Sequence, residues 1–303
     1  MNVVEAMTYR GQLRVDEPMS KHTSWRVGGN ADLYYIPADL SDLQDYLASL
    51  ESSVPINWVG LGSNMLVRDG GIRGVVIAPL NALKDLKLCD EGCIYAEVGV
   101  TCAKLTKFCD KNGLTGAAFL AGIPGTIGGA LAMNAGAFGS ETWPFVERVV
   151  MINRRGLTIN RKAAEFEIAY RRVSQFADEW FAAAYFRFGF ACEAKAKAAR
   201  QNSDIRHLLQ KRNASQPIGL PSCGSVFKNP PGDYAAKLIE RAGLKGYTLG
   251  EASVSNKHAN FIISNQATRA ADIEALIGYI QKAVRQAFGV ELETEVRIVG
   301  EAS

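Results

Sequence analysis

Residues 114–140 form one uncharged, glycine-rich segment that limits what this chain can fold into more than any other feature does. The segment reads LTGAAFLAGIPGTIGGALAMNAGAFGS, with seven glycines and one proline. Its length and lack of charge are typical of a membrane span, but its glycines and Pro124 disfavour a continuous helix. We therefore expect bare backbone that approaches a large group, such as phosphate oxygens and an aromatic ring. The alternative is a buried glycine-rich loop without a ligand.

Length and composition indicate a globular protein. The 303 residues suffice for two or three domains with a sizeable core. The net charge of +3 is spread along the chain, which argues against nucleic acid as a partner and suits an anionic small molecule in a local pocket. The first 18 residues lack the apolar stretch of a signal peptide. We expect a cytoplasmic protein that does not enter a membrane.

The cysteines are expected to be reduced thiols with structural roles. No two of them form a CxxC pair, and the three histidines lie far in sequence from Cys89 and Cys93, the pair that comes nearest to a metal-binding pattern. The six cysteines are Cys89, Cys93, Cys102, Cys109, Cys192 and Cys223.

Hydrophobic periodicity predicts a chain of mixed helices and strands. Helices are expected at 41–50, 102–112, 193–212, 233–242 and from about Ile273 to Val284, and strands at 56–59, 75–77, 148–153, 181–188, 260–264 and 292–299. Ser41 and Gln44 read as a capping box that opens the first helix, and Gly113 and Gly243 as caps that end two others. The Ala-, Lys- and Arg-rich helix at 193–212 indicates a boundary near residue 200.

Two common phosphate-binding loops are excluded. No glycine begins the Gly-x4-Gly-Lys-Ser/Thr sequence of a Walker A loop. Gly60 and Gly62 supply the first two glycines of a Rossmann fingerprint, but Met65 stands where the third belongs. A dinucleotide would therefore be bound by another architecture.

Seven motifs follow one another along nearly the whole chain in the order of a known enzyme family. They are TSWRVGGNAD, VGLGSNMLVRDGGIRGVVI, GLTGAAFLAGIPGTIGGALAMNAGAFG, AYRRVS, CGSVFKNP, VSNKHANFIISN and LETEVRIVG. The chain thus resembles UDP-N-acetylenolpyruvoylglucosamine reductase, the oxidoreductase of bacterial peptidoglycan precursor synthesis also called UDP-N-acetylmuramate dehydrogenase. The connection from Arg171 to Ser225 is short, which is similar to the branch that lacks an inserted tyrosine loop.

The resemblance implies an α+β protein with the vanillyl-alcohol-oxidase-type (PCMH-type) FAD-binding fold. On this chain it predicts two α/β subdomains at 1–80 and 81–200 and a C-terminal α/β substrate-binding domain at 201–303. It also implies noncovalent FAD, NADPH as co-substrate and a monomer that acts on small molecules. The residues implied to bind the cofactor are Gly60, Gly62, Ser63, Asn64, Gly122, Ile123, Pro124, Gly125, Thr126, Gly128, Gly129, Asn134 and Gly136. Thr126 stands where the family commonly has serine and keeps the hydroxyl.

The implied reaction transfers a hydride to the vinyl carbon of an enolpyruvyl group and a proton to its neighbour. Negative charge then develops on the substrate carboxylate, so the site needs fixed donors there and an acid. By resemblance, Arg171 binds this carboxylate with its guanidinium fork, Glu295 shares it in the protonated form, and Ser225 supplies the proton. The implied substrate-binding residues are Tyr170, Lys228, Asn229, Lys257 and His258.

Each of these residues also has a structural interpretation. Arg171 can be a surface side chain, Glu295 part of an exposed charge ladder, and Ser225 a turn hydroxyl. Two other functions stay open at this point, an alcohol oxidase of the same flavin fold and a non-catalytic sugar-nucleotide-binding protein. The joint occurrence of the three side chains favours the reductase.

Overall fold

The structure is a computed structural model that describes residues 9–90, 92–190 and 201–303, with the side chains of all of these except 201–204. Its contacts divide the chain into two compact units. Unit 1 comprises Met1–Val15, Leu33–Gly60 and Val75–Ile205, and unit 2 comprises Asp16–Asp32, Leu61–Gly74 and Arg206–Ser303. The sequence instead predicts three domains that are each continuous along the chain. Those domain boundaries remain a prediction.

Three strands contain points at which the chain passes from one unit to the other. They are β1 (Gln12–Pro18), β2 (Asn30–Ile36) and β5 (Ile72–Ile77). With β3 (Ile56–Trp58) they form a sheet in the order β1-β2-β5-β3, in which β3 and β5 run parallel.

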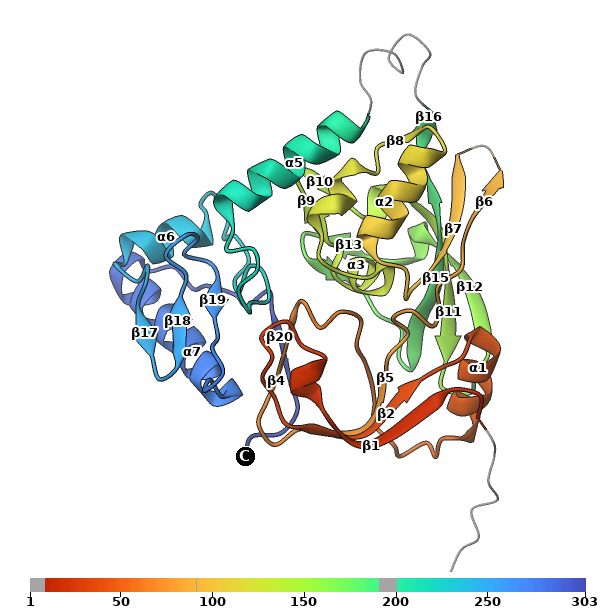
Figure 1. Cartoon of the computed structure of the whole chain (residues 1–303), viewed down its shortest axis with the longest axis horizontal. Coiled ribbons are helices and arrows are strands. Elements are labelled where there is room, and N and C mark those ends of the chain that lie inside the picture. Colours follow the sequence, from red (N-terminus) through yellow and green to blue (C-terminus); the bar gives the residue numbers. More distant parts are fainter. Residues whose placement is uncertain (1–8, 91, 191–200) are drawn as a thin grey trace, which may run out of the picture. The chain divides into compact units, whose positions relative to one another are not determined.

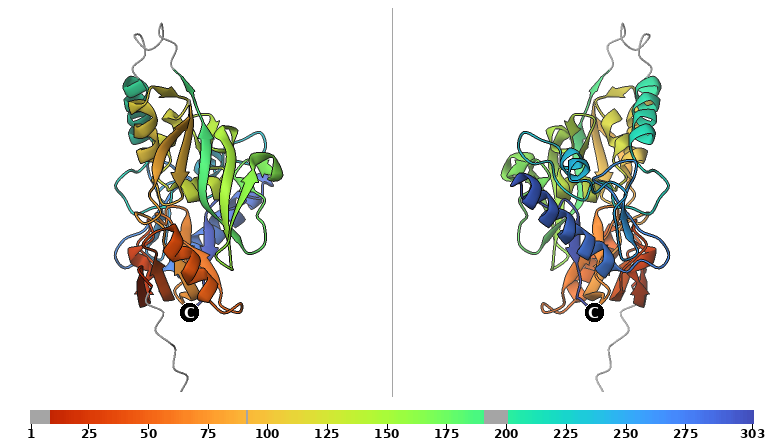
Figure 2. Two further views of the ribbon diagram at one scale, coloured as in Figure 1. Left: turned by 90° about the vertical axis from the view of Figure 1, so that its right-hand side faces the viewer. Right: turned by 90° about the vertical axis from the view of Figure 1, so that its left-hand side faces the viewer.

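Unit 1 is built on a five-stranded sheet in the order β12-β11-β15-β7-β6, in which all neighbouring strands run antiparallel (Figure 1). Its strands are β6 (Leu86–Asp90), β7 (Cys93–Glu97), β11 (Val146–Asn153), β12 (Thr158–Lys162) and β15 (Glu179–Arg187). The other elements are α1 (Leu40–Ser49), α2 (Cys102–Lys111), α3 (Ile127–Met133), η3 (Trp143–Phe145), η4 (Ala163–Glu165), β13 (Ile168–Ala169), β14 (Arg172–Val173) and β16 (Gly189–Phe190). The sheet strands form the orange and green layer in both views of Figure 2.

The expected capping box of α1 is wrong. The helix begins at Leu40, one residue earlier than expected, because Asp39 is the N-cap and its carboxylate accepts a hydrogen bond from the amide of Asp42. The side chain of Gln44 instead donates to the backbone oxygen of Gly156 at 3.0 Å. The apolar side chains Leu43, Tyr46 and Leu47 of α1 are all buried in the unit 1 core.

The glycine-rich segment folds as short elements rather than one helix. It contains β8 (Leu114–Thr115), η2 (Ala118–Gly122), α3, β9 (Gly136–Ala137) and β10 (Ser140–Glu141). Thr126 caps α3 by accepting the Gly129 amide, and Asn134 ends it at a φ of 42°. Within the described part of the chain, no helix has the length and apolar character needed to cross a membrane.

Unit 2 has its own core around α7 (Ala270–Phe288). The residues expected to line its apolar face, from Ile273 to Val284, are buried against a three-stranded sheet and α6 (Ala235–Arg241). The remaining elements are η1 (Met19–Lys21), β4 (Met65–Val67), β17 (Thr248–Leu249), β18 (Ala252–Val254), β19 (Ile262–Ile263) and β20 (Arg297–Val299). The helix α5 (Gln201–Ser215) begins in unit 1 and passes into unit 2 after Ile205. Two expected strands are shorter than predicted, because only 262–263 of 260–264 and 297–299 of 292–299 are strand. Residues 193–200 of the expected solvated helix lie outside the described residues.

Candidate active site

The loop that carries Ser225 is anchored to the segment that carries Gly62. The buried thiol of Cys223 lies 3.5 Å from the backbone oxygen of Gly62 and 3.4 Å from that of Met65. Burial raises the pKa of Cys223 to about 12, so the group stays a neutral thiol. Gly224 follows at a φ of 70°, a backbone conformation that favours glycine. Ser225 is therefore presented half-buried on a loop tied down on both sides.

Glu295 lies on a segment hydrogen-bonded to the Ser225 loop. Its amide donates to the backbone oxygen of Val226 at 2.8 Å, and Phe227 bridges to Thr294. The side chain of Asn260 holds the same loop, accepting the Phe227 amide at 3.0 Å and donating to the Phe227 oxygen at 2.8 Å. Within unit 2, the structure thus brings the backbones of two of the three expected catalytic residues together.

Arg171 lies in unit 1, in the turn between β13 and β14. Its φ of 55° is in the left-handed region, which is uncommon for a bulky residue and marks a constrained turn. The guanidinium donates to the backbone oxygens of Asn134 at 3.3 Å and Gly136 at 3.0 Å. The exposed Tyr170 ring lies 5.2 Å from the guanidinium carbon. These two backbone oxygens orient the guanidinium.

Asn134, which the resemblance places near the flavin, is 1% exposed and fully engaged within unit 1. Its side-chain amide donates to Glu141 at 2.8 Å and to the backbone oxygen of Ala169 at 3.2 Å. Its side-chain oxygen accepts the amide of Trp143 at 3.2 Å. Glu141 was not identified from the sequence, because no motif or spacing indicates that its carboxylate accepts a hydrogen bond from Asn134.

Several glycines of the expected cofactor site are required by packing within the chain itself. A Cβ at Gly60 would lie 2.5 Å from the Thr126 hydroxyl, and one at Gly122 would lie 2.4 Å from the Phe138 ring. At Gly62, with a φ of 58°, it would lie 2.0 Å from the backbone oxygen of His22. These three positions would need glycine even without a ligand.

The amides at the start of α3 are already engaged. Ile127 donates to Val100, Gly128 to Val98, and Gly129 to the Thr126 hydroxyl. The expectation of bare N–H groups is therefore not met at these positions. Gly129 nevertheless leaves open space over its Cα, with only the Thr126 hydroxyl at 3.9 Å from an added Cβ. This bare backbone surface fits the close approach of a cofactor.

Lys228 and Asn229 follow Ser225 and already have partners in unit 2. The Lys228 ammonium lies 2.5 Å from a Glu293 carboxylate oxygen, and its amide donates to the Glu293 backbone. The Asn229 side-chain oxygen accepts the amide of Ala235 at the start of α6. A substrate phosphate would have to compete with Glu293 for Lys228.

Lys257 and His258 form part of a turn that supports the Ser225 loop. The Lys257 ammonium donates to the backbone oxygen of Asn213. The ring nitrogen of His258 accepts the Asn260 amide at 3.3 Å, and its ring packs against Phe261. Burial, with a smaller contribution from the nearby Lys245 charge, lowers the pKa of His258. In this geometry His258 has the contacts of a structural residue that supports the turn.

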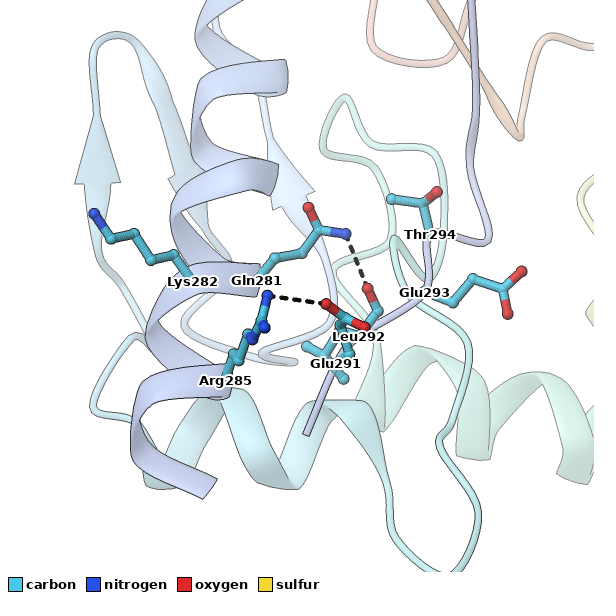
Figure 3. Close-up of a pocket in the computed structure, with 7 residues that line it drawn as sticks. All are labelled: Gln281, Lys282, Arg285, Glu291, Leu292, Glu293 and Thr294. Atoms are coloured by element: carbon cyan, nitrogen blue, oxygen red, sulfur yellow. Dashed lines mark hydrogen bonds and ion pairs between the residues drawn. The ribbon is translucent and has the colours of Figure 1, made fainter. Parts of the chain in front are cut away.

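A pocket of about 590 Å³ lies beside the segment that leads to Glu295 (Figure 3). It is lined by Gln281, Lys282, Arg285, Glu291, Leu292, Glu293 and Thr294. Gln281 donates to the Leu292 oxygen at 2.9 Å, and Arg285 pairs with Glu291 at 3.1 Å. Lys282 and Glu293 point to opposite sides in Figure 3. The lining balances two cations with two anions and contains none of the expected site residues.

Comparison with known proteins identifies the family. A UDP-N-acetylenolpyruvoylglucosamine reductase of Coxiella burnetii (strain RSA 331 / Henzerling II) is 53% identical over 310 residues, covering 96% of this chain and 96% of that protein. The chain belongs to this reductase family. The reductase of Methylococcus capsulatus is also 53% identical to this chain. The match covers 97% of this chain and 95% of that protein.

Two domain families match separate parts of the chain. Residues 31–160 match the FAD binding domain family, and residues 216–299 match the C-terminal domain of UDP-N-acetylenolpyruvoylglucosamine reductase. The crystal structure of the Thermus caldophilus reductase aligns with a TM-score of 0.79 at 26% identity, covering 95% of this chain and 98% of that one. The resemblance, the vanillyl-alcohol-oxidase-type FAD-binding fold and the assignment as an FAD-dependent oxidoreductase are thereby confirmed.

Proposed function

We propose that this chain reduces UDP-N-acetylglucosamine enolpyruvate to UDP-N-acetylmuramate with NADPH in peptidoglycan precursor synthesis. The observation that carries the proposal is the hydrogen bond between the Glu295 amide and the Val226 oxygen. It holds the backbone of Glu295 against the residue that follows Ser225, which supports the pairing of a carboxyl group with a serine hydroxyl that carboxylate binding and protonation of the adjacent carbon require.

FAD, held noncovalently and reduced by NADPH, supplies the hydride. The residues proposed to hold it are the loop Gly60–Asn64 and the segment from Gly122 to Gly136, where the open space at Gly129 would accommodate it. The subdomains 1–80 and 81–200 would hold this cofactor, and the domain 201–303 the sugar nucleotide.

Arg171 binds the substrate carboxylate and stabilises the negative charge that develops on it. Its guanidinium is oriented by backbone oxygens, and its planar fork of donors suits two carboxylate oxygens. Glu295 shares the carboxylate in its protonated form, because two like charges there would repel each other. Ser225 donates a proton to the carbon next to the carboxylate.

Lys228 and Asn229 are proposed to contact the diphosphate or sugar, with Tyr170, Lys257 and His258 nearby in the same role. The protein would act as a cytoplasmic monomer on small molecules, without nucleic acid or membrane partners. This part of the proposal rests on the resemblance and on the low, evenly spread charge of the chain.

An anaerobic absorbance titration tests the proposal. Yellow protein should bleach on addition of NADPH and recover its colour when UDP-N-acetylglucosamine enolpyruvate is added. Ser225→Ala should keep its flavin and its reduction by NADPH, while reoxidation by substrate slows about 100-fold or more. Ser215→Ala, at an exposed position on α5, is the matched control. Reoxidation by the enolpyruvyl substrate at the wild-type rate in Ser225→Ala would remove Ser225 from the mechanism.

A further inference from the structure

The turn that carries Arg171 depends on two side chains from elsewhere in unit 1. Residues 170–171 connect β13 to β14, and the left-handed φ of Arg171 has to be maintained by the surroundings. The backbone oxygen of Ala169, directly before this turn, accepts the side-chain amide of Asn134. The guanidinium of Arg171 in turn donates to the backbone oxygen of Asn134. Asn134 therefore contacts both the start of the turn and the end of the Arg171 side chain.

Glu141 determines how the Asn134 amide is oriented. Its carboxylate accepts from that amide at 2.8 Å, while the Asn134 side-chain oxygen faces the Trp143 amide. With both ends of the amide engaged, the side chain cannot flip without losing hydrogen bonds. Buried amides are held in one orientation by such complementary partners.

Gly136 places Glu141 and Arg171 against the same short backbone segment. It pairs with Glu141 across β9 and β10, and α3, β9, β10 and β13 are labelled in one region of unit 1 in Figure 1. A Cβ on Gly136 would lie 3.0 Å from the Glu141 side chain and 3.3 Å from the Arg171 guanidinium. The bare glycine thus lets the two side chains approach the same strand.

We infer that Asn134 and Glu141 are positioning residues for Arg171, which orient its guanidinium for binding the substrate carboxylate. The inference rests on the proposed function of Arg171. Without the Glu141 carboxylate, the Asn134 amide loses the acceptor that orients it, and the Ala169 oxygen loses a fixed donor. The Arg171 guanidinium can then shift from the position in which it binds the substrate carboxylate, and even a small shift weakens this binding in the transition state.

The test compares both half-reactions of the full-length flavoprotein by anaerobic stopped-flow absorbance. Glu141→Ala should reoxidise with the enolpyruvyl substrate about 10- to 100-fold more slowly, with unchanged flavin content and reduction by NADPH. Glu141→Gln keeps an oxygen acceptor for Asn134 and should restore the rate. Asn134→Asp, which tolerates the left-handed backbone, provides a second variant if Glu141→Ala does not fold. Glu165→Ala, which removes an exposed ion pair of unit 1, is the control.

A double-mutant cycle decides whether Glu141 acts through Arg171. The inference expects Glu141→Ala to slow reoxidation in the wild-type background and to add little in an Arg171→Ala background. It is overturned if the two effects multiply, if Glu141→Gln is as slow as Glu141→Ala, or if both Glu141→Ala and Asn134→Asp keep the wild-type rate. The single variant Arg171→Ala tests the proposed function separately. If it is reoxidised at the wild-type rate, the role proposed for Arg171 is wrong.

Discussion

The side-chain amide of Asn64 donates a hydrogen bond to the backbone oxygen of Glu295 at 3.0 Å, across 231 residues of sequence. The amide of Arg297 donates to the backbone oxygen of Asn64 at 3.1 Å, and β20 then continues as the parallel partner of β4. Asn64 is expected from the resemblance to contact the cofactor. In the structure it fixes the segment that carries a proposed catalytic carboxyl group.

Replacing Asn64 should therefore destabilise unit 2. Asn64→Ala leaves the Glu295 oxygen without this donor, and we expect the free energy of unfolding to fall by about 1–2 kcal/mol. Urea denaturation followed by circular dichroism measures the change. Asn112→Ala removes an exposed side-chain hydrogen bond at the end of α2 and should cost less than about 0.5 kcal/mol. Equal losses in the two variants would contradict the assignment.

Among the five cysteines that the structure describes, alkylation should distinguish the exposed one from the buried four. Burial raises the pKa of Cys102, Cys109 and Cys223 to about 12 and that of Cys93 to about 11. Because the thiolate is the reactive form, native protein treated with iodoacetamide should be labelled at the exposed Cys89 before these four. Peptide mass spectrometry of native and urea-unfolded samples measures the extent of labelling at each cysteine. Rapid native labelling of Cys223 would show that the Ser225 loop opens.

Asp42 should contribute acid-sensitive stability. Burial alone would raise its pKa, but hydrogen bonds from the Tyr35 hydroxyl at 2.5 Å and from the amides of Arg10, Gly11 and Ala38 outweigh it and hold the pKa below the usual value. A carboxyl with a lowered folded pKa stabilises above its unfolded pKa, and this contribution is lost as the pH falls through the folded value. We expect the unfolding free energy to decline below about pH 4.

The Asp42→Asn variant tests this linkage. It removes the charge and one acceptor at nearly constant volume, and should lower the free energy of unfolding at neutral pH by about 2 kcal/mol. It should also weaken the decline toward acid that urea titrations at several pH values measure. An acid decline as steep in Asp42→Asn as in the wild type would assign the pH dependence to other carboxyl groups.

Two glycines with similar backbone angles should respond differently to alanine. Gly113 has a φ of 69° and nothing within 4 Å of an added Cβ, so Gly113→Ala should cost only the backbone strain of about 1–2 kcal/mol. Gly62→Ala adds a clash with the His22 oxygen, which should cost about 1–3 kcal/mol more. Thermal unfolding of the two variants measures the difference, and equal shifts would show that the His22 segment gives way.

Local periodicity was sufficient to predict most helices. The helical spacing of its aliphatic residues predicts α7, and these residues are buried: Ile273, Leu276, Ile277, Ile280 and Val284. Gly113, at a positive φ, directly follows Asn112, the C-cap residue of α2, and ends the helix as expected. The start of α1 was predicted wrongly, because Asp39 and Ser41 are both good capping residues and only the folded geometry selects the Asp39 carboxylate. Residues 292–296 were predicted as strand, but pairing with β4 begins only at Arg297.

The order and kind of the side chains determined by themselves the family, the flavin-binding fold and the candidate residues Arg171, Ser225 and Glu295. Only the tertiary structure decided what orients them. Asn64 meets Glu295 across 231 residues, and Asn134 meets Ala169 across 35. Such hydrogen bonds leave no trace in local periodicity, because each forms only after burial of the core has closed the intervening chain and excluded competing water.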